Sequence, residues 1–265
     1  MMFSVKNGCF GYRASKPVLR DVSLNVRSGE VLCVLGPNGV GKTTLLKCMM
    51  GMLAWNKGAS YLDDKKLSDY SQREIWKRIA YVPQAKGSAF AFTAREMVLM
   101  GRSSHINMLS QPSREDLVKA EEAMESCGIT YLSDKKCTEM SGGELHMVLI
   151  ARALAAEPQM LVFDEPESNL DFKNQLVVLQ TIKSLAKEHG LCAIVNTHYP
   201  EHALRIADRA LLLRKDGSNE SGPIGEMITS DKLRKTFGVN VHIQHFTVDG
   251  VEYHDVVPLS LAVSS

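Results

Sequence analysis

Three short runs of consecutive apolar residues indicate buried strands: residues 31–35, 160–163 and 192–195. Strands that are apolar at every position are typical of parallel sheets covered on both faces. Between the second and third runs, residues 173–188 carry Leu176, Leu179, Ile182, Leu185 and Ala186 at helical spacing. The order strand, helix, strand predicts an α/β fold built on a mainly parallel, doubly wound sheet.

Other stretches predict additions to this core. Residues 3–26 alternate in part between apolar and polar, as in a half-exposed antiparallel sheet. Residues 93–132 are typical of helices, with a break around residues 110–113, and residues 239–257 have β character around a turn at residues 249–250. No linker rich in Pro or Gly separates independent domains. We therefore expect one core with an N-terminal antiparallel β layer, a helical lobe and a short C-terminal β tail.

Composition excludes several classes of protein. The chain has 265 residues, of which 45% are hydrophobic and 23% charged, as in ordinary globular proteins. Its 31 basic and 30 acidic residues give a net charge of +1, so no nucleic-acid partner is expected. No run of 18 apolar residues could span a bilayer, and the first residues lack a signal-peptide segment. We expect a cytosolic chain, dissolved or docked peripherally, with reduced and mostly buried cysteines.

Residues 36–43 match the motif G-x-x-x-x-G-K-[ST] in full, between a predicted strand and a predicted helix. Glycines let backbone N–H groups surround anionic oxygens, and the following helix presents its positive end to the same group. The motif predicts that Lys42 reaches the β- and γ-phosphates of a nucleotide and that the Thr43 hydroxyl binds Mg²⁺. The candidate phosphate-binding residues are Gly36, Pro37, Asn38, Gly39, Gly41, Lys42, Thr43 and Thr44.

The apolar run at residues 160–163 leads directly into Asp164 and Glu165. Carboxylates at the end of a buried strand are costly unless they bind something. Asp164 is therefore the candidate Mg²⁺ ligand, directly or through water, and Glu165 the candidate that polarises the attacking water. Taken alone, Asp164 could also be a helix N-cap.

A second glycine-rich turn, Ser141-Gly142-Gly143-Glu144, precedes a helix-forming stretch that runs to residue 156. The start of a helix with bare backbone favours an anion, although a helix-capping turn has the same appearance. Because one phosphate loop already surrounds one triphosphate, a second such turn indicates closure over the γ-phosphate, which another subunit could supply.

In this order, the motifs resemble those of the ATP-binding-cassette (ABC) ATPases, from about Phe3 to Ile228. The resemblance implies that Gln84 touches Mg²⁺ or the attacking water. It implies that His198 contacts the γ-phosphate and that Tyr12 stacks on adenine. Residues 140–144 resemble the signature motif, 161–165 the Walker B strand, and 168–171 the D-loop, which places Asp171 near the nucleotide.

The family's architecture implies an ATPase domain over residues 1–236, with a helical subdomain inserted at about 85–158. Residues 237–265 would then be a C-terminal β extension packed on the same domain. The family also implies head-to-tail dimers in which each ATP, with Mg²⁺, lies between one copy's phosphate loop and the other copy's signature turn.

Two departures from the family pattern stand out. Glu144 replaces the usual Gln, and Tyr199 follows His198 where an acidic residue is common. A carboxylate near a γ-phosphate is unfavourable unless Glu144 points away or pairs with a cation. Neither change removes a residue that performs the chemistry, so we expect an active ATPase.

Residues 92–102, with His105 nearby, resemble the helical lobe of importers for iron–siderophore, haem and cobalamin-type chelates. Molybdate or tungstate import is a related variant. The resemblance implies separate permease subunits that dock near residues 84–114, an indirect role for a substrate-binding protein, and a position on the cytoplasmic face of the membrane. The alternatives are a non-transport ABC ATPase acting on nucleic acid or the ribosome, and an iron–sulfur assembly ATPase.

The tail contains His242, His245 and His254, which together could suggest a metal site. A separation of three along one strand places His242 and His245 on opposite faces. We therefore expect surface or packing roles for these histidines.

Overall fold

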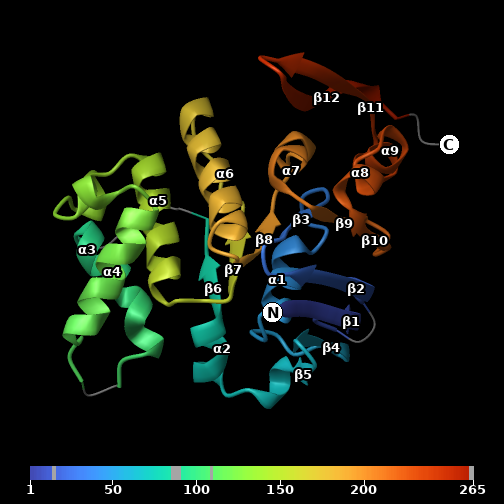
Figure 1. Cartoon of the computed structure of the whole chain (residues 1–265). Helices are drawn as coiled ribbons and strands as arrows, with labels where there is room; N and C mark the ends of the chain where they lie inside the picture. Colours follow the sequence, from blue (N-terminus) through green and yellow to red (C-terminus); the bar gives the residue numbers. More distant parts are fainter. Residues whose placement is uncertain (14–15, 85–90, 108–109, 263–265) are drawn as a thin grey trace.

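The computed structural model describes residues 1–13, 16–84, 91–107 and 110–262. Its centre is a six-stranded sheet in the order β10-β9-β3-β8-β7-β6 (Figure 1). The strands β9, β3, β8, β7 and β6 are parallel, and β10 runs antiparallel to β9 at one edge. The strands are β3 (Val31–Leu35), β6 (Ile79–Val82), β7 (Met160–Asp164), β8 (Cys192–Asn196), β9 (Arg209–Leu213) and β10 (Asn219–Pro223). The predicted parallel core is confirmed.

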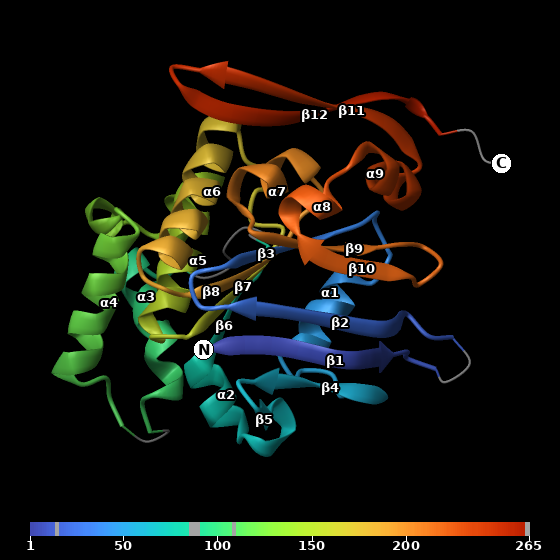
Figure 2. The same cartoon turned by 45° about the vertical axis from the view of Figure 1, so that its right-hand side comes forward.

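Each face of this sheet forms a separate hydrophobic core, because successive side chains of a strand point to opposite faces. In β3, Leu32 and Val34 belong to a first core, on the side of the N-terminal strands, while Val31, Cys33 and Leu35 belong to a second core on the other face. Figure 2 shows the resulting layers, with the N-terminal strands on one side of the sheet and the later helices on the other. This double burial explains why the central strands are apolar at every position.

The first core is covered by an antiparallel sheet in the order β2-β1-β4-β5 and by two helices. Strand β2 alternates between buried and exposed residues along most of its length, in agreement with the pattern of residues 3–26. These elements are β1 (Met2–Phe10), β2 (Leu19–Arg27), β4 (Lys57–Leu62), β5 (Lys65–Lys66), α1 (Lys42–Met49) and α2 (Gln72–Arg78). Helix α1 begins at Lys42, where the phosphate-binding motif predicts a helix.

The predicted helical lobe consists of α3 (Ala94–Leu99), α4 (Arg114–Ser126) and α5 (Gly142–Ala155), at the left of Figure 1. Each of these helices begins with a capping box, in which a Ser or Thr side chain and an acidic side chain three residues later satisfy each other's backbone N–H groups. The predicted break is real, because α3 ends at Leu99 and α4 starts at Arg114. The short 3₁₀ helices are η1 (Leu67–Asp69), η2 (Met100–Ser104), η3 (Thr130–Leu132) and η4 (Cys137–Glu139).

Arg102 joins the parts of this lobe through a buried ion-pair network. Its guanidinium lies 3.0 Å from Asp116 and 2.8 Å from Glu157, and it also donates to the carbonyl of Ala155 at 2.8 Å. The pKa of Asp116 falls to about 2, because Ser113 donates two hydrogen bonds to its carboxylate and Arg102 donates another. One buried cation thus connects η2, the start of α4 and the end of α5.

The second face of the sheet carries the remaining helices and a C-terminal hairpin. These elements are α6 (Phe172–Lys187), α7 (Pro200–Ile206), α8 (Ile224–Met227), α9 (Ser230–Phe237), β11 (Val239–Val248) and β12 (Val251–Leu261). Val241, Ile243 and Val256 of the hairpin pack against the second core. The predicted turn at residues 249–250 is confirmed, and β12 continues past residue 257.

The cysteines, and the lack of a long apolar helix among the described residues, agree with what the composition predicts. All six cysteines are free thiols, and all except Cys9 are buried. Over the described ranges, the structure contains no helix of the length and apolarity needed to cross a membrane.

We expect Asp116→Asn to destabilise the protein by about 2 kcal/mol at pH 7, because it removes the carboxylate whose pKa is lowered. Because the pKa of Asp116 is lower in the folded protein, its carboxylate stabilises the fold at pH values above 3.8, the pKa in the unfolded chain. This stabilisation is lost as the pH falls toward about 2. Urea unfolding should therefore show the same stability difference between the two proteins at pH 7 and pH 5, and a smaller difference at pH 3. Glu115→Gln, at an exposed position of the same helix turn, is the matched control. A difference that stays constant with pH would contradict this account.

Candidate active site

Three segments that are distant in the sequence meet at one edge of the parallel sheet. Strand β8 lies between β3 and β7, so the carboxyl ends of these three strands are neighbours. The phosphate loop follows β3, Asp164 ends β7, and His198 follows β8. In α/β sheets, ligands bind beyond the carboxyl ends of the strands.

A cavity of about 310 Å³ opens at this edge. It gathers half of the predicted nucleotide-binding residues, with Glu165 and His198, together with Val18, which the sequence did not single out. Its lining is Tyr12, Val18, Asn38, Gly39, Gly41, Lys42, Thr43, Thr44, Glu165 and His198. Tyr12 is 66% exposed at the mouth, and its hydroxyl lies 3.3 Å from the Thr44 hydroxyl. An exposed ring in this place can stack on a base.

The phosphate loop requires glycine at positions 36, 39 and 41, and a Cβ atom at Gly36 would lie 2.5 Å from the carbonyl oxygen of Leu213. Gly39 has φ 76° and Gly41 has φ 107°, in the left-handed region that favours glycine. A Cβ atom at Gly41 would also lie 2.6 Å from Cγ1 of Val18. Gly39 and Gly41 let the backbone turn tightly into α1, whose positive end faces the cavity.

Lys42 is buried beneath this loop and makes three contacts. Its Nζ donates to the carbonyl oxygens of Gly36 at 2.7 Å and Pro37 at 3.2 Å, and lies 2.9 Å from Nδ1 of His198. Burial lowers the pKa of Lys42 to about 8, although the nearby charges of Glu165 and Asp164 act in the opposite direction. An ammonium group has three N–H donors, so a phosphate must replace existing partners of Lys42.

His198 connects Lys42 to Glu165. Its Nε2 lies 2.6 Å from Oε1 of Glu165. Because Lys42 donates to Nδ1, the hydrogen-bond network assigns the proton to Nε2, which donates to the carboxylate. Glu165 has φ 52°, a left-handed conformation that costs roughly 1–2 kcal/mol in a residue other than glycine. This strain directs the carboxylate toward His198 and the cavity, as strained residues often do at functional sites.

Asp164 lies beside Thr43 in a dense set of hydrogen bonds. Its carboxylate accepts from Asn196 Nδ2 at 2.5 Å, from the Tyr81 hydroxyl at 3.0 Å and from the Thr43 hydroxyl at 3.4 Å. The hydroxyl of Thr43 and the carboxylate of Asp164 form the oxygen donor set that Mg²⁺ prefers. The residues present therefore fit a Mg²⁺ ion.

Tyr81 and Asn196 are site residues that sequence reasoning missed. They belong to β6 and β8, the two strands that flank β7, and both orient Asp164. Burial, together with the charge of Asp164, raises the pKa of Tyr81, which keeps its hydroxyl a donor. Their position at the carboxyl ends of apolar runs was the signal available in the sequence.

Gln84 is placed differently from Thr43 and Asp164. Its amide Nε2 donates to the Ser168 hydroxyl at 2.9 Å, and that hydroxyl donates to the carbonyl of Glu165 at 2.8 Å. Gln84 is therefore joined to the segment that follows Glu165. Contact of Gln84 with Mg²⁺ or with the attacking water stays a prediction.

The signature turn forms the start of α5. Ser141 caps the helix by accepting from the Glu144 N–H, and the Glu144 carboxylate accepts from the Ser141 N–H. Lys135 Nζ lies 2.9 Å from both carboxylate oxygens of Glu144, and this contact holds the Glu144 pKa below its usual range. The negative charge that replaces the usual Gln is thus paired with a cation.

The signature turn lies next to the D-loop. Asp171 caps α6 by accepting from the Asn174 N–H at 2.8 Å, and a Cβ atom on Gly143 would lie 2.4 Å from the Asn174 side chain. Within the described residues, the cavity lining includes neither residues 141–144 nor Asp171. A single chain therefore brings the predicted site residues together as two separate groups.

Several known proteins are similar to this chain in sequence and in structure. A family model described as ABC transporter matches residues 19–168. The molybdate import ATP-binding protein of Haemophilus influenzae is 33% identical and covers 97% of this chain and 96% of its own length. The hemin import ATP-binding protein of Rhodococcus jostii is 36% identical, over 90% of this chain and 80% of its own length.

Among solved structures, an ABC transporter of metal-chelate type in an inward-facing conformation is similar. It has a TM-score of 0.87 and 32% identity, and the match covers 97% of each chain. The chain belongs to the ABC transporter family, as an ATP-binding, ATP-hydrolysing subunit. The fold and the family resemblance expected from the sequence are confirmed.

The lowered pKa of Lys42 predicts that nucleotide affinity depends on pH. The phosphates bind the ammonium form, so bound ATP raises this pKa, and affinity should be constant below about pH 8. Above that value, affinity should fall by up to about tenfold per pH unit. Calorimetric titration with a non-hydrolysable ATP analogue from pH 7 to 9.5 would measure the effect.

Two variants control this prediction. Lys42→Ala should weaken binding by at least about tenfold, because it removes charged hydrogen bonds. Lys42→Arg keeps a positive charge that does not titrate in this range, so any residual affinity should not vary with pH. Constant affinity of the unaltered protein up to pH 9.5 would contradict the assignment of Lys42.

Proposed function

We propose that this protein is the ATP-hydrolysing subunit of a membrane importer for a metal chelate or a metal oxyanion. The observation that carries the proposal is the nearly full-length similarity to a molybdate import subunit and to a metal-chelate type ABC transporter, which includes the C-terminal part of the chain. The two import relatives are named for molybdate and for hemin, so metal-containing cargo is their shared property. The transported molecule itself is not expected to contact this subunit.

We assign the chemical roles as follows. Lys42 and the loop backbone hold the β- and γ-phosphates, and Tyr12 stacks on the base. Thr43 and Asp164 hold Mg²⁺, with Gln84 as a further ligand, and the ion would neutralise developing phosphate charge. Glu165 orients and polarises the attacking water, while His198 exchanges its contact with Lys42 for one with the γ-phosphate.

The separation of the two groups of site residues supports a head-to-tail dimer. Ser141, Gly142, Gly143, Glu144 and Asp171 would contact the nucleotide held by a second copy. The Glu144 N–H is already bonded to Ser141, but the N–H groups of Gly142 and Gly143 have no acceptor within the helix and remain available to an anion. Pairing of Glu144 with Lys135 removes the repulsion that a free carboxylate would exert on the γ-phosphate.

The helical lobe offers a place for a permease. A hollow of about 300 Å³ lies between α2 and β6 on one side and η2 and α5 on the other. Met100 and Gly101 line it, within the stretch 84–114 where docking is expected, and Met100 is 42% exposed. Residues 85–90 and 108–109 of that stretch lie outside the described residues. A short permease helix in this hollow would place the protein on the cytoplasmic face of the membrane, with a substrate-binding protein acting only indirectly.

This function is consistent with the division expected from the sequence. We treat residues 1–236 as the ATPase domain, with the helical subdomain inserted at about 85–158, and residues 237–265 as a C-terminal extension. The near-neutral net charge gives no support to a nucleic-acid role. Tight, salt-sensitive binding of DNA or RNA by the purified protein would replace the import proposal.

Glu165→Gln should reduce ATP hydrolysis by about 10²-fold or more, because the amide cannot accept a proton from water. ATP should still bind, and the variant should accumulate as a dimer that is visible by size-exclusion chromatography with light scattering. The same variant carrying Ser141→Arg should bind ATP and remain monomeric, because the added side chain blocks the second copy. Rapid turnover by Glu165→Gln would remove Glu165 from its role, and a dimer of the double variant would exclude the signature turn from the interface.

Met100→Asp should abolish capture of a co-expressed permease while the isolated subunit keeps its ATPase activity. The reason is that a charge in the hollow must be desolvated when a helix docks. Met52→Asp is the matched control, since Met52 is 48% exposed and does not line the hollow. Permease capture that is equally strong for both variants in detergent pull-downs would place the docking surface elsewhere.

A further inference from the structure

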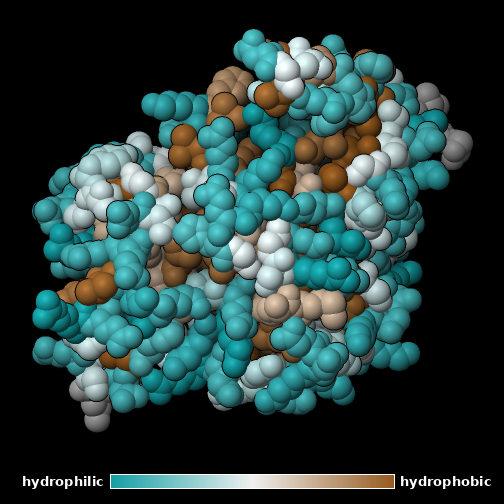
Figure 3. Space-filling model, in the orientation of Figure 1, coloured by the Kyte–Doolittle hydropathy of each residue, from teal (hydrophilic) through white to brown (hydrophobic). Residues whose placement is uncertain are grey.

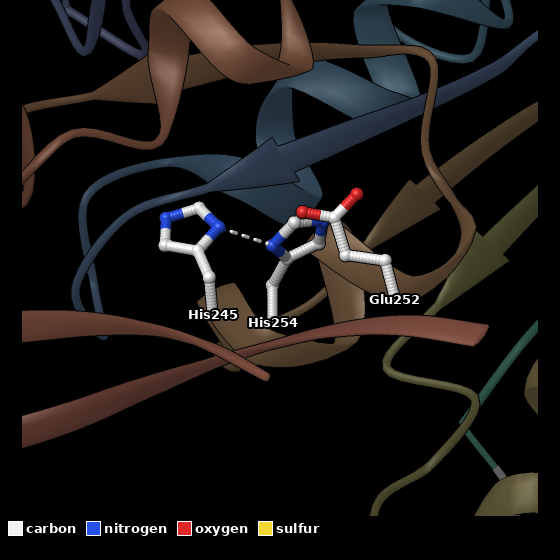
Figure 4. A group of neighbouring side chains, drawn as sticks. All are labelled: His245, Glu252 and His254. Atoms are coloured by element: carbon white, nitrogen blue, oxygen red, sulfur yellow. Dashed lines mark hydrogen bonds between the residues drawn. The ribbon is translucent and has the colours of Figure 1, made fainter. Parts of the chain in front are cut away.

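Two histidines and one glutamate meet on one face of the C-terminal hairpin. His245 on β11 is directly opposite His254 on β12, and Glu252 lies two residues before His254 on the same face. Figure 4 shows the three side chains rising from the same side of the strands. Nδ1 of His245 and Nδ1 of His254 are 2.7 Å apart, and the candidate ligand atoms of the three residues all lie within 4.8 Å of one another.

The chemistry of this group is that of a metal site. Two facing imidazole nitrogens can share only one proton, and a neutral imidazole otherwise offers a lone pair. Two nitrogens and one carboxylate oxygen suit first-row divalent transition ions, which are often held by such sets of three ligands with a further position open. Mg²⁺ and Ca²⁺ prefer oxygen ligands alone.

We propose that His245, Glu252 and His254 form a binding site for a divalent transition-metal ion, with Zn²⁺ as the reference ion. The residues are separate from those of the nucleotide cavity, so the proposal does not depend on the proposed function. Zn²⁺ would tie β11 to β12 close to the turn of the hairpin. Neither ligand strand could form the site alone.

The proposed metal site lies on the face of the hairpin that contacts the rest of the protein. The same hairpin face carries Ile243 and Val256, which pack against the second core. His254 also lines a cavity of about 370 Å³ between the hairpin, α6 and α7, together with Glu201 and His202. In Figure 3, hydrophobic side chains show between the hairpin at the top and the body beneath it. A metal-bound hairpin would be held more rigidly over this cavity.

The spacing of His242 and His245 along one strand does not bear on a site formed across two strands. His242 and His245 do lie on opposite faces of β11, as their spacing predicts. The partner of His245 is His254, which comes from the next strand through the register of the hairpin. His242, exposed on the other face, is therefore a matched control.

The test uses the full-length protein, stripped of metal with EDTA and saturated with Mg²⁺ and ADP to engage the nucleotide site. We expect calorimetric titration with ZnCl₂ to show one ion per chain at this site. His245→Ala and His254→Ala should each weaken binding by more than about tenfold, since even outer-shell changes commonly cost that much. Glu252→Gln should lose less Zn²⁺ affinity than the two histidine variants, and His242→Ala should bind Zn²⁺ as tightly as the unaltered protein does.

Two further measurements test whether the bound ion is held by these histidines. Zn²⁺ should raise the melting temperature of the unaltered protein and of His242→Ala, but not of a variant lacking both His245 and His254. The Co²⁺ complex should show visible absorption without the intense near-ultraviolet band of thiolate ligands. Equal Zn²⁺ affinity in the double variant, thiolate coordination, or equal stabilisation by Mg²⁺ would each overturn the proposal.

Discussion

The position of β8 between β3 and β7 is the constraint on which the nucleotide site depends. Parallel pairing on both sides of β8 brings the phosphate loop, Asp164 and His198 to one edge of the sheet. Asn196, at the end of β8, then donates across to Asp164, so the register of the strands orients the carboxylate as well as placing it. The two apolar cores on the faces of the sheet hold this register, since a slip by one residue would turn each side chain to the wrong face.

Charge balance within the edge is as important as position. Lys42 is a buried cation close to two carboxylates, and it is held by the loop carbonyls and by His198. The contacts that join Lys42, His198 and Glu165 therefore use the same side-chain groups that we expect to bind the γ-phosphate and the attacking water. Nucleotide binding would exchange one set of contacts for another, which couples the phosphate loop to the segment after β8.

Charge pairing and close packing also organise the parts of the chain that lie away from this edge. Glu144 is neutralised by Lys135, and Gly143 packs against Asn174, so the signature turn and the D-loop form one surface. Its separation from the cavity of the same chain supports a second copy as its partner. The C-terminal hairpin packs on the second core through a few apolar residues, and its polar end carries the histidine pair.

The amino-acid sequence determined the parallel core, the phosphate loop, the acidic pair and the start of α1, because these depend on local patterns of apolar residues and glycines. It also predicted a helical stretch with a break around residues 110–113. Only the tertiary structure decided that Tyr81 and Asn196 orient Asp164, that Gln84 binds Ser168, and that His245 faces His254 rather than His242. The reason is physical: these contacts join strands or loops distant along the chain, and strand order and register, which no local pattern encodes, decide which side chains meet.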